Sequence, residues 1–184
     1  MRHLGTVNLE TPRLILRKLA PQDAQAVYRN YASDDEVTRY LTWPTHRSVE
    51  TTAAYVAFVI ASYEKPSSYE WGIELKELGQ IVGSISVVNL VEETEAVELG
   101  WVLGRAWWGQ EIMPEAARAI IRFLFDEVGV NRISAVHDVE NPKSGRVMRK
   151  IGMRREGTLR GAGKNNRGIV DLEIYGMLKG DARQ

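Results

Sequence analysis

Hydrophobic side chains recur along this chain with two periods, and the period changes several times. A spacing of three or four residues, typical of an amphipathic helix, follows Pro21, and it returns in 48–63, 114–128 and 142–151. β-Branched and aromatic residues gather instead in short segments bounded by turn-forming residues, and these segments predict seven strands. The predicted strands are 14–16, 69–76, 80–90, 96–103, 132–139, 154–159 and 169–178.

The order of these segments predicts the fold class. One strand is followed by helices, three strands, a helix, a strand, a helix and two strands, which is the order of a mixed α/β (α+β) fold on one sheet. Short turns separate 69–76, 80–90 and 96–103, so these three strands are expected to form an antiparallel meander. Neither a repeat, a low-complexity tract nor an interdomain linker interrupts the sequence, and 1–184 is interpreted as a single domain.

Composition narrows the classes of function. The chain of 184 residues is 44% hydrophobic, enough for a sizeable core, and its 24 basic and 24 acidic side chains cancel. That balance gives no sign of a nucleic-acid groove or of direct nucleic-acid binding. There is no cysteine and the three histidines are scattered, so neither a disulfide framework nor a metal site is expected. With neither a signal peptide nor an apolar run of about 20 residues, we expect a cytoplasmic protein without membrane contact.

One segment combines the features of an anion-binding site. The strand 96–103 leads through a loop, 104–113, into a helix expected to begin at Pro114. The first turn of a helix has unpaired backbone N–H groups and a partial positive charge, which suit a pyrophosphate. Pro114 fits such a turn because a proline has no N–H to leave unpaired. On these grounds alone the segment is a place where an anion could dock, or simply a connection.

The sequence around this turn is similar to that of a known family. The run from Glu98 to Ala116, with Glu-Leu-Gly in the strand and Trp-Gly-Gln in the loop, resembles the acetyl-CoA motif of the GNAT superfamily. The run 139–153 resembles the second cofactor motif of that family, and 10–14 resembles its first strand. The match spans the chain in order and spacing. It is most similar to the ribosomal-protein N-terminal (alanine/serine) acetyltransferases.

The resemblance implies a fold, a cosubstrate and a set of residues. The fold is that of GNAT proteins: a mostly antiparallel sheet of about seven strands, helices on both faces, and a cofactor strand splayed from its neighbour. The cosubstrate is acetyl-coenzyme A (acetyl-CoA), whose pantetheine amides are expected to pair with 101–103 and whose pyrophosphate is expected at the N–H groups of 109–113. Asn141 is expected to hydrogen-bond the pantetheine arm, and Ser144 to lie near the thioester sulfur. The residues assigned to the cofactor are Trp101, Val102, Leu103, Trp108, Gly109, Gln110, Glu111, Ile112, Met113, Asn141 and Ser144.

Glu111 departs from the family pattern, which usually has glycine at this position. Glycine lets the backbone approach a phosphate closely and adopts positive φ without strain. A carboxylate that faced the ligand would add bulk and like charge, whereas one directed to solvent would be screened. We expect acetyl-CoA binding to be weakened but not abolished.

Acetyl transfer to an amine needs a neutral nucleophile and an acid for the departing thiolate. Glu98 is expected to be the general base, directly or through water, because it begins the cofactor strand beside the splay; the alternative is a half-exposed strand carboxylate. Ser144 is the expected acid, since Met148 stands where many family members carry a tyrosine; the alternative is a residue that satisfies backbone donors at a helix start. Tyr175 is a second candidate acid, with packing in the core as its alternative.

The acceptor is expected to be a primary amine that attacks acetyl-CoA in a ternary complex. Tyr40, Trp43 and His46 lie in the irregular segment that tends to border the acceptor site in this family, and they are expected to contact the acceptor. The resemblance favours a protein N-terminus, and a small amine (an amino acid, a polyamine or an amine drug) is the alternative. Glu111 also raises the alternative of a non-catalytic CoA-binding regulatory module. An edge strand of the sheet could pair with a second copy, so a homodimer is a further expectation.

Overall fold

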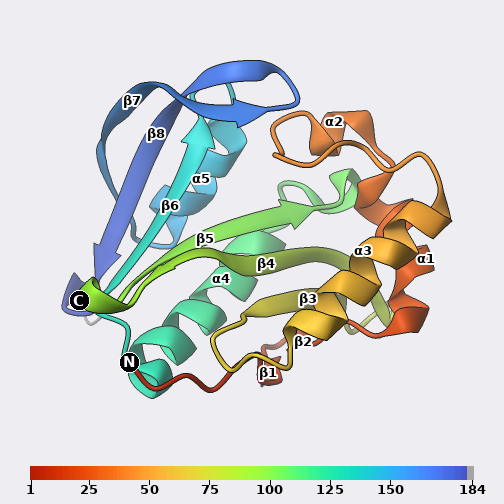
Figure 1. The fold of residues 1–184 in the computed structure, drawn as a ribbon, viewed down its shortest axis with the longest axis horizontal. Coiled ribbons are helices and arrows are strands. Elements are labelled where there is room, and N and C mark those ends of the chain that lie inside the picture. The colour runs from red at the N-terminus through yellow and green to blue at the C-terminus, as the bar shows by residue number, and fades with distance from the viewer. Residues whose placement is uncertain (182–184) are drawn as a thin grey trace.

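The computed structural model of the protein describes residues 1–181. In that part of the chain eight strands form one sheet, in the order β1-β2-β3-β4-β5-β6-β8-β7 (Figure 1). Neighbouring strands are antiparallel, except that β5 and β6 are parallel. The strands are β1 (Leu9–Glu10), β2 (Leu14–Arg17), β3 (Glu70–Leu75), β4 (Gln80–Val91), β5 (Ala96–Leu103), β6 (Arg132–Asp138), β7 (Arg154–Asn165) and β8 (Gly168–Leu178).

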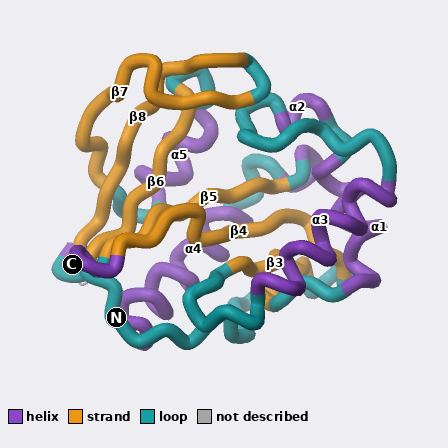
Figure 2. The backbone as a smooth tube through the Cα atoms, viewed as in Figure 1, coloured by secondary structure: helices purple, strands orange, loops and turns teal. Residues whose placement is uncertain are grey.

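Helices lie on both faces of this sheet, as Figures 1 and 2 show. One face is covered by α1 and α3 together with the helical turns beside them, and the other by α4 and α5. The helices are α1 (Ala24–Val27), α2 (Asp35–Thr38), α3 (Val49–Ser62), α4 (Ile112–Phe123) and α5 (Pro142–Lys150). Shorter 3-10 or π turns are η1 (Pro21–Asp23), η2 (Tyr28–Ala32), η3 (Glu92–Thr94), η4 (Arg105–Trp107) and η5 (Leu124–Val128). The mixed, mostly antiparallel architecture predicted from the sequence is confirmed.

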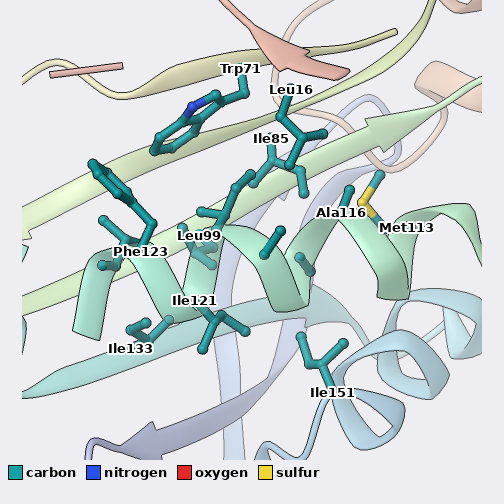
Figure 3. Packing of buried hydrophobic residues seen from close by; sticks show 14 of the residues in the cluster. Leu16, Trp71, Ile85, Leu99, Met113, Ala116, Ile121, Phe123, Ile133 and Ile151 are labelled. Atoms are coloured by element: carbon teal, nitrogen blue, oxygen red, sulfur yellow. The ribbon is translucent and has the colours of Figure 1, made fainter. Parts of the chain in front are cut away.

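Two hydrophobic clusters hold the layers together. The larger one fills the space between the sheet and α4, where Trp71 of β3 meets Phe123 of α4 edge-on with ring centres 5.9 Å apart (Figure 3). The smaller one lies between the sheet and the α1–α3 side. Because successive side chains of a strand point to opposite faces, Val97 and Leu99 of β5 join the larger cluster and Glu98 faces the other side. The sheet therefore presents polar side chains toward α3.

Strands β5 and β6 separate part-way along their length. They pair from Ala96 opposite Arg132 to Glu98 opposite Ser134, and beyond that point the pairing ends although both strands continue. Figure 1 shows β6 leaving the direction of β5 toward the β7–β8 hairpin. The predicted splay of the cofactor strand is thus present, and Glu98 is the last residue of β5 before it opens.

Three of the differences from the sequence prediction have a clear local cause. The eighth strand is the two-residue β1, which is too short to give a periodic signal. The helix α4 begins at Ile112, two residues before Pro114, so that the proline lies inside the first turn where its missing N–H costs no hydrogen bond. Strand β7 runs to Asn165 and not to Leu159, because its distal half pairs with β8 past an irregularity in register while its residues are mostly exposed and glycine-rich.

Candidate functional site

A cleft of about 1070 Å³ opens where β5 and β6 diverge. Its walls come from β3, β4 and β5, from the start of α4, from α5, and from the distal part of the β7–β8 hairpin. The segment that follows α2 closes one side. Every residue predicted for the site lines this cleft except Gln110 and His46. The structure therefore brings together side chains that are more than 100 positions apart in the sequence.

The start of α4 forms one end of the cleft. Among residues 1–181, no backbone hydrogen bond uses the amide N–H groups of 109–113, and no side chain caps this helix. Gly109 and Glu111 have φ values of 76° and 62°, and these two positive angles turn the loop into the helix. Free N–H groups and the positive end of the helix dipole make this turn suitable for phosphate oxygens.

The carboxylate of Glu111 is ion-paired with Lys150 of α5. Both side chains are about half exposed, at 49% and 50%, so water screens them. The acidic side chain therefore contacts a cation, and the N–H groups of the turn are not engaged by it. The positive φ of Glu111 belongs to the region that glycine adopts most readily, which matches the glycine usual at this position in the motif.

Asn141 and Ser144 begin α5 on the opposite wall. Asn141 is the N-cap, and its Oδ1 accepts a long hydrogen bond of 3.5 Å from the Ser144 N–H. This contact leaves the Nδ2 hydrogens of Asn141 for a ligand. Ser144 is partly buried and lines the cleft. One residue earlier, the Lys143 ammonium lies 3.7 Å from the centre of the Trp108 ring, so that a cation–π contact joins the two walls.

Aromatic side chains form the wall nearest α3. Trp43 stacks on Tyr55 with ring centres 6.2 Å apart, and both line the cleft. The Tyr40 hydroxyl donates to the Glu140 carbonyl at 2.9 Å, which links the segment after α2 to the loop before α5. His46 lies behind this wall: it is buried, hydrogen-bonded to Thr52 at 2.8 Å and 5.1 Å from the Trp43 ring. Burial lowers the pKa of the His46 imidazole, which favours the neutral form.

Two carboxyl groups face the cleft from neighbouring parts of the sheet. Glu98 stands where β5 and β6 part, and burial raises its pKa. The sequence analysis missed the second, Glu70 of β3, which lines the cleft beside Tyr55. Burial raises the pKa of Glu70 to about 7, although the Tyr55 hydroxyl opposes this by donating to Oε1 at 2.9 Å. The only sequence signal was position: 70 and 98 both lie on the polar face of predicted strands.

Neither Met148 nor Tyr175 supplies a hydroxyl to the cleft. Met148 is buried in the larger cluster, and Tyr175 is buried on β8 with its hydroxyl accepting from Arg149 at 2.9 Å. Ser144 is thus better placed than Tyr175 for the predicted acid. Among residues 1–181 there is no group of three acidic or histidine side chains that could hold a metal ion. Within the same range, no helix has the length and apolar character required to span a bilayer.

The site combines two features: a pair of strands that diverges, and a turn with free amides that leads into a helix. Comparison with known proteins shows which family has this arrangement. Residues 13–154 match a family described as the acetyltransferase (GNAT) domain. The chain belongs to the GNAT acetyltransferase family. It is accordingly an acetyl-CoA-dependent N-acetyltransferase, as its motifs predict.

Individual GNAT proteins resemble it over nearly the whole chain. An uncharacterised N-acetyltransferase of Bacillus subtilis, YoaA, is 31% identical over 93% of this chain and 96% of its own length. The ribosomal protein uS5-alanine N-acetyltransferase of Escherichia coli is 26% identical over 82% of this chain and 80% of its own. A GNAT-family acetyltransferase from Bacillus anthracis, known from its crystal structure, superposes with a TM-score of 0.82 at 29% identity, over 95% of this chain and 99% of that one.

Proposed function

We propose that this GNAT enzyme transfers the acetyl group of acetyl-CoA to a primary amine at a protein N-terminus, by direct attack in a ternary complex. The observation that carries the proposal is the continuity of the cleft. An uncapped helix start with free amides forms one end, an aromatic wall with two carboxyl groups forms the other, and they meet where β5 and β6 part. One end suits phosphates, and the other suits a cationic amine.

The residues at the α4 end fit a CoA thioester. Beyond Glu98 the pairing of β5 with β6 ends, so the β6-facing edge of 99–103 is available for pantetheine amides. The amides of 109–113 face phosphate oxygens, and Lys143, Arg146 and Lys150 of α5 add positive charge along the same path. Acetyl-CoA supplies an activated acetyl carbon, and the chain supplies the charges and hydrogen bonds that hold it.

Two side chains are assigned to proton transfer. Glu98, at the vertex of the opening, takes a proton from the acceptor nitrogen, directly or through a water molecule. The raised pKa of its buried carboxyl makes it a stronger base than an exposed glutamate. Ser144, on the α5 side, donates a hydrogen bond or a proton toward the departing sulfur. Removal of a general base typically lowers the rate by about 100- to 10,000-fold.

A protein N-terminus is favoured over a small amine because of two features. The cleft is open and large, and the relative from Escherichia coli is named for an alanine N-terminus of a ribosomal protein. A purely CoA-binding module is disfavoured, since Glu98, Asn141 and Ser144 all line the cleft. A site without catalysis has no need of a desolvated carboxyl at the vertex.

The test begins with calorimetric titration of acetyl-CoA, followed by thiol release with two probes: a hexapeptide with a free N-terminal alanine, and spermidine. We expect micromolar binding and faster release with the peptide. Glu98→Gln is expected to lower kcat at least 100-fold with an unchanged Kd for acetyl-CoA. Faster turnover of spermidine would redirect the acceptor to a small amine. Binding without release in either case would leave a CoA-binding module as the better description.

A further inference from the structure

The carboxyl group of Glu70 occupies a central position on the acceptor side of the sheet. Glu70 pairs with Ser86 of β4, and Ser86 pairs with Gly100 of β5, just past the point where β5 leaves β6. With strands about 4.8 Å apart, the backbone of Glu70 is about 10 Å from that of Gly100, and both residues face the cleft. A glutamate side chain covers about half of that span. Glu70 and Glu98 therefore face the same cleft from strands that one strand separates.

The surroundings of Glu70 hold its side chain in place without neutralising it. Tyr55 of α3 donates its hydroxyl to Oε1 at 2.9 Å, and Tyr63 of α3 donates to the Glu70 backbone carbonyl at 3.0 Å. Tyr31 of η2 also faces the carboxyl, and Glu98 faces the same cleft. His46 packs on Tyr55 with ring centres 5.8 Å apart. Among residues 1–181, the Glu70 carboxyl has no ion-pair partner.

The cations of the cleft lie on one side of it, together with the acids Glu111, Asp138 and Glu140. The cations that line it among the described residues come from α5 and β7, namely Lys143, Arg146, Lys150 and Lys164. The lining residues of α2, α3 and β3 to β5 contribute acids and no cation, again within 1–181, and these acids are Glu36, Glu70 and Glu98. The Glu70 carboxyl is partly buried, has no ion-pair partner within the described residues and lies at the end of the cleft that has the aromatic wall. These features attract a cation. An ammonium group is the cation that the proposed reaction brings there.

We propose that Glu70 is a second catalytic carboxylate: it binds the acceptor amine as its ammonium ion and takes the first proton, with Tyr55 as its positioning residue. This inference rests on the proposed function. The proton passes from the ammonium nitrogen to a Glu70 oxygen, and the freed lone pair forms the new N–C bond as the C–S bond breaks. Glu98 takes the second nitrogen proton, which ends on the departing sulfur. Glu70 returns the first proton to solvent.

The acid–base properties of Glu70 agree with this role. Its pKa of about 7, raised by burial, lets the carboxylate accept a proton from an ammonium group and release it again near neutral pH. The Tyr55 hydroxyl stabilises the charged form and so lowers the pKa from what burial alone would give. Glu70 is needed in its deprotonated form and the amine in its protonated form, so wild-type kcat/KM is expected to be highest between pH 7 and the amine pKa of about 8 and to fall on either side.

The experiment measures kcat/KM for the alanine hexapeptide between pH 5 and 9, in Glu70→Gln, Tyr55→Phe and wild type. The ratio of variant to wild type is plotted; the titration of the peptide amine cancels in it for Tyr55→Phe, which still binds the ammonium ion, but not for Glu70→Gln, which must use the neutral amine. For Glu70→Gln we expect a ratio of about 0.01 or less up to pH 7 that rises by pH 9, because an α-amino group with a pKa of about 8 then no longer carries the proton that Glu70 removes. For Tyr55→Phe we expect a ratio below 1 near pH 7 that recovers by pH 9, since the pKa of Glu70 rises without its donor.

The controls separate chemistry from folding and from the proposed function. Glu77→Gln, in the exposed turn of the same hairpin, is expected to give a ratio of 1 throughout. Glu70→Asp is expected to recover part of the rate near pH 7, and the Kd for acetyl-CoA is expected to stay unchanged in every variant. A Glu70→Gln ratio that does not vary with pH, or a lost affinity for acetyl-CoA, overturns the role of Glu70 while the wild-type enzyme still turns over. A wild type that releases no thiol with the peptide or with spermidine overturns the proposed function, and this inference with it.

Discussion

Glu111 at the N-terminal end of α4 and Lys150 in the last turn of α5 form an ion pair between two walls of the cleft, at the end proposed to hold the pyrophosphate. Both side chains are about half exposed, so the pair adds little to stability. Its consequence is electrostatic. The Glu111 carboxylate neutralises the Lys150 ammonium, which would otherwise be available to the proposed pyrophosphate. Glu111 also has a φ of 62°, in a region that glycine adopts with less strain than a residue with a side chain.

Replacing Glu111 by glycine is expected to strengthen acetyl-CoA binding. The change removes a negative charge next to the phosphates, frees Lys150 and allows the backbone to approach the ligand. We expect the Kd, measured by calorimetry in low salt, to fall about 3- to 10-fold. Because exposed charges are screened, the gain is expected to shrink at 0.5 M salt.

A double-mutant cycle with Lys150→Gln isolates the pair. Loss of Lys150 is expected to weaken binding more in the Glu111→Gly background than in wild type, because only there is the ammonium free for phosphate. Equal effects in both backgrounds would show that Lys150 does not meet the ligand. A higher Kd for acetyl-CoA in Glu111→Gly alone would mean that the Glu111–Lys150 ion pair holds the binding site in its active arrangement.

The parts of this arrangement that could be predicted from sequence are those fixed by local pattern. The strand 96–103 was predicted with the bounds found, and the helical spacing over 48–63 is that of α3, whose N-cap is Ser48 with its Oγ accepting from the Thr51 N–H. Both depend on residues within one turn or one strand. The sequence also showed that Glu111 stands where the motif usually has glycine. Its ion-pair partner Lys150 lies 39 residues away, and no local spacing connects the two residues.

The contacts that were not predicted depend on tertiary packing. The sequence marks Glu70 only by its place on the polar face of a strand, since its burial and its bond to Tyr55 come from α3 crossing β3. His46 was expected at the acceptor site with Trp43, yet a buried hydrogen bond to Thr52 holds it behind that residue. An irregular loop has no period, so the direction of each side chain is set by what it packs against.

Asn141→Asp separates the two roles of this residue. Aspartate keeps the oxygen that caps α5, so stability is expected to stay within about 0.5 kcal/mol of wild type. It lacks the amide hydrogens, so the Kd for acetyl-CoA is expected to rise about 10-fold, corresponding to one lost hydrogen bond. Asn141→Ala, which loses both groups, is expected to lower the free energy of unfolding by about 1 kcal/mol as well. Thermal denaturation and calorimetry measure the two effects, and an unchanged Kd in the aspartate variant would remove Asn141 from the ligand site.

Trp43→Ala tests the aromatic wall. Its ring lines the cleft and stacks on Tyr55, so its loss removes apolar and cation–π contact with the acceptor but nothing from the cofactor path. We expect the acceptor KM to rise about 10-fold, with kcat and the Kd for acetyl-CoA little changed. Trp43→Phe keeps a ring and is expected to lie close to wild type. Steady-state kinetics with the alanine hexapeptide distinguish this from a packing role, in which stability falls and KM does not move.

Asp138 anchors the β7–β8 hairpin to the end of β6, and its replacement by asparagine is expected to lower the free energy of unfolding by roughly 2 kcal/mol at pH 7. The buried carboxylate accepts from Asn165 at 2.8 Å and from Arg167 at 3.0 Å. Burial alone would raise the pKa of Asp138, but these partners and the Glu140 N–H hold it below its usual value. A depressed pKa stabilises the fold above the unfolded value of about 3.9, and that contribution is lost as the pH falls through the lower folded value. The difference between variant and wild type in urea denaturation is therefore expected to be constant from pH 7 to about pH 5 and to shrink below about pH 4.

Asp171→Asn is the matched control on the same hairpin, since its carboxylate accepts an exposed N–H from Gly161, and a change within about 0.5 kcal/mol is expected there. A difference at Asp138 that persisted unchanged to pH 3 would assign the effect to packing and not to the charge.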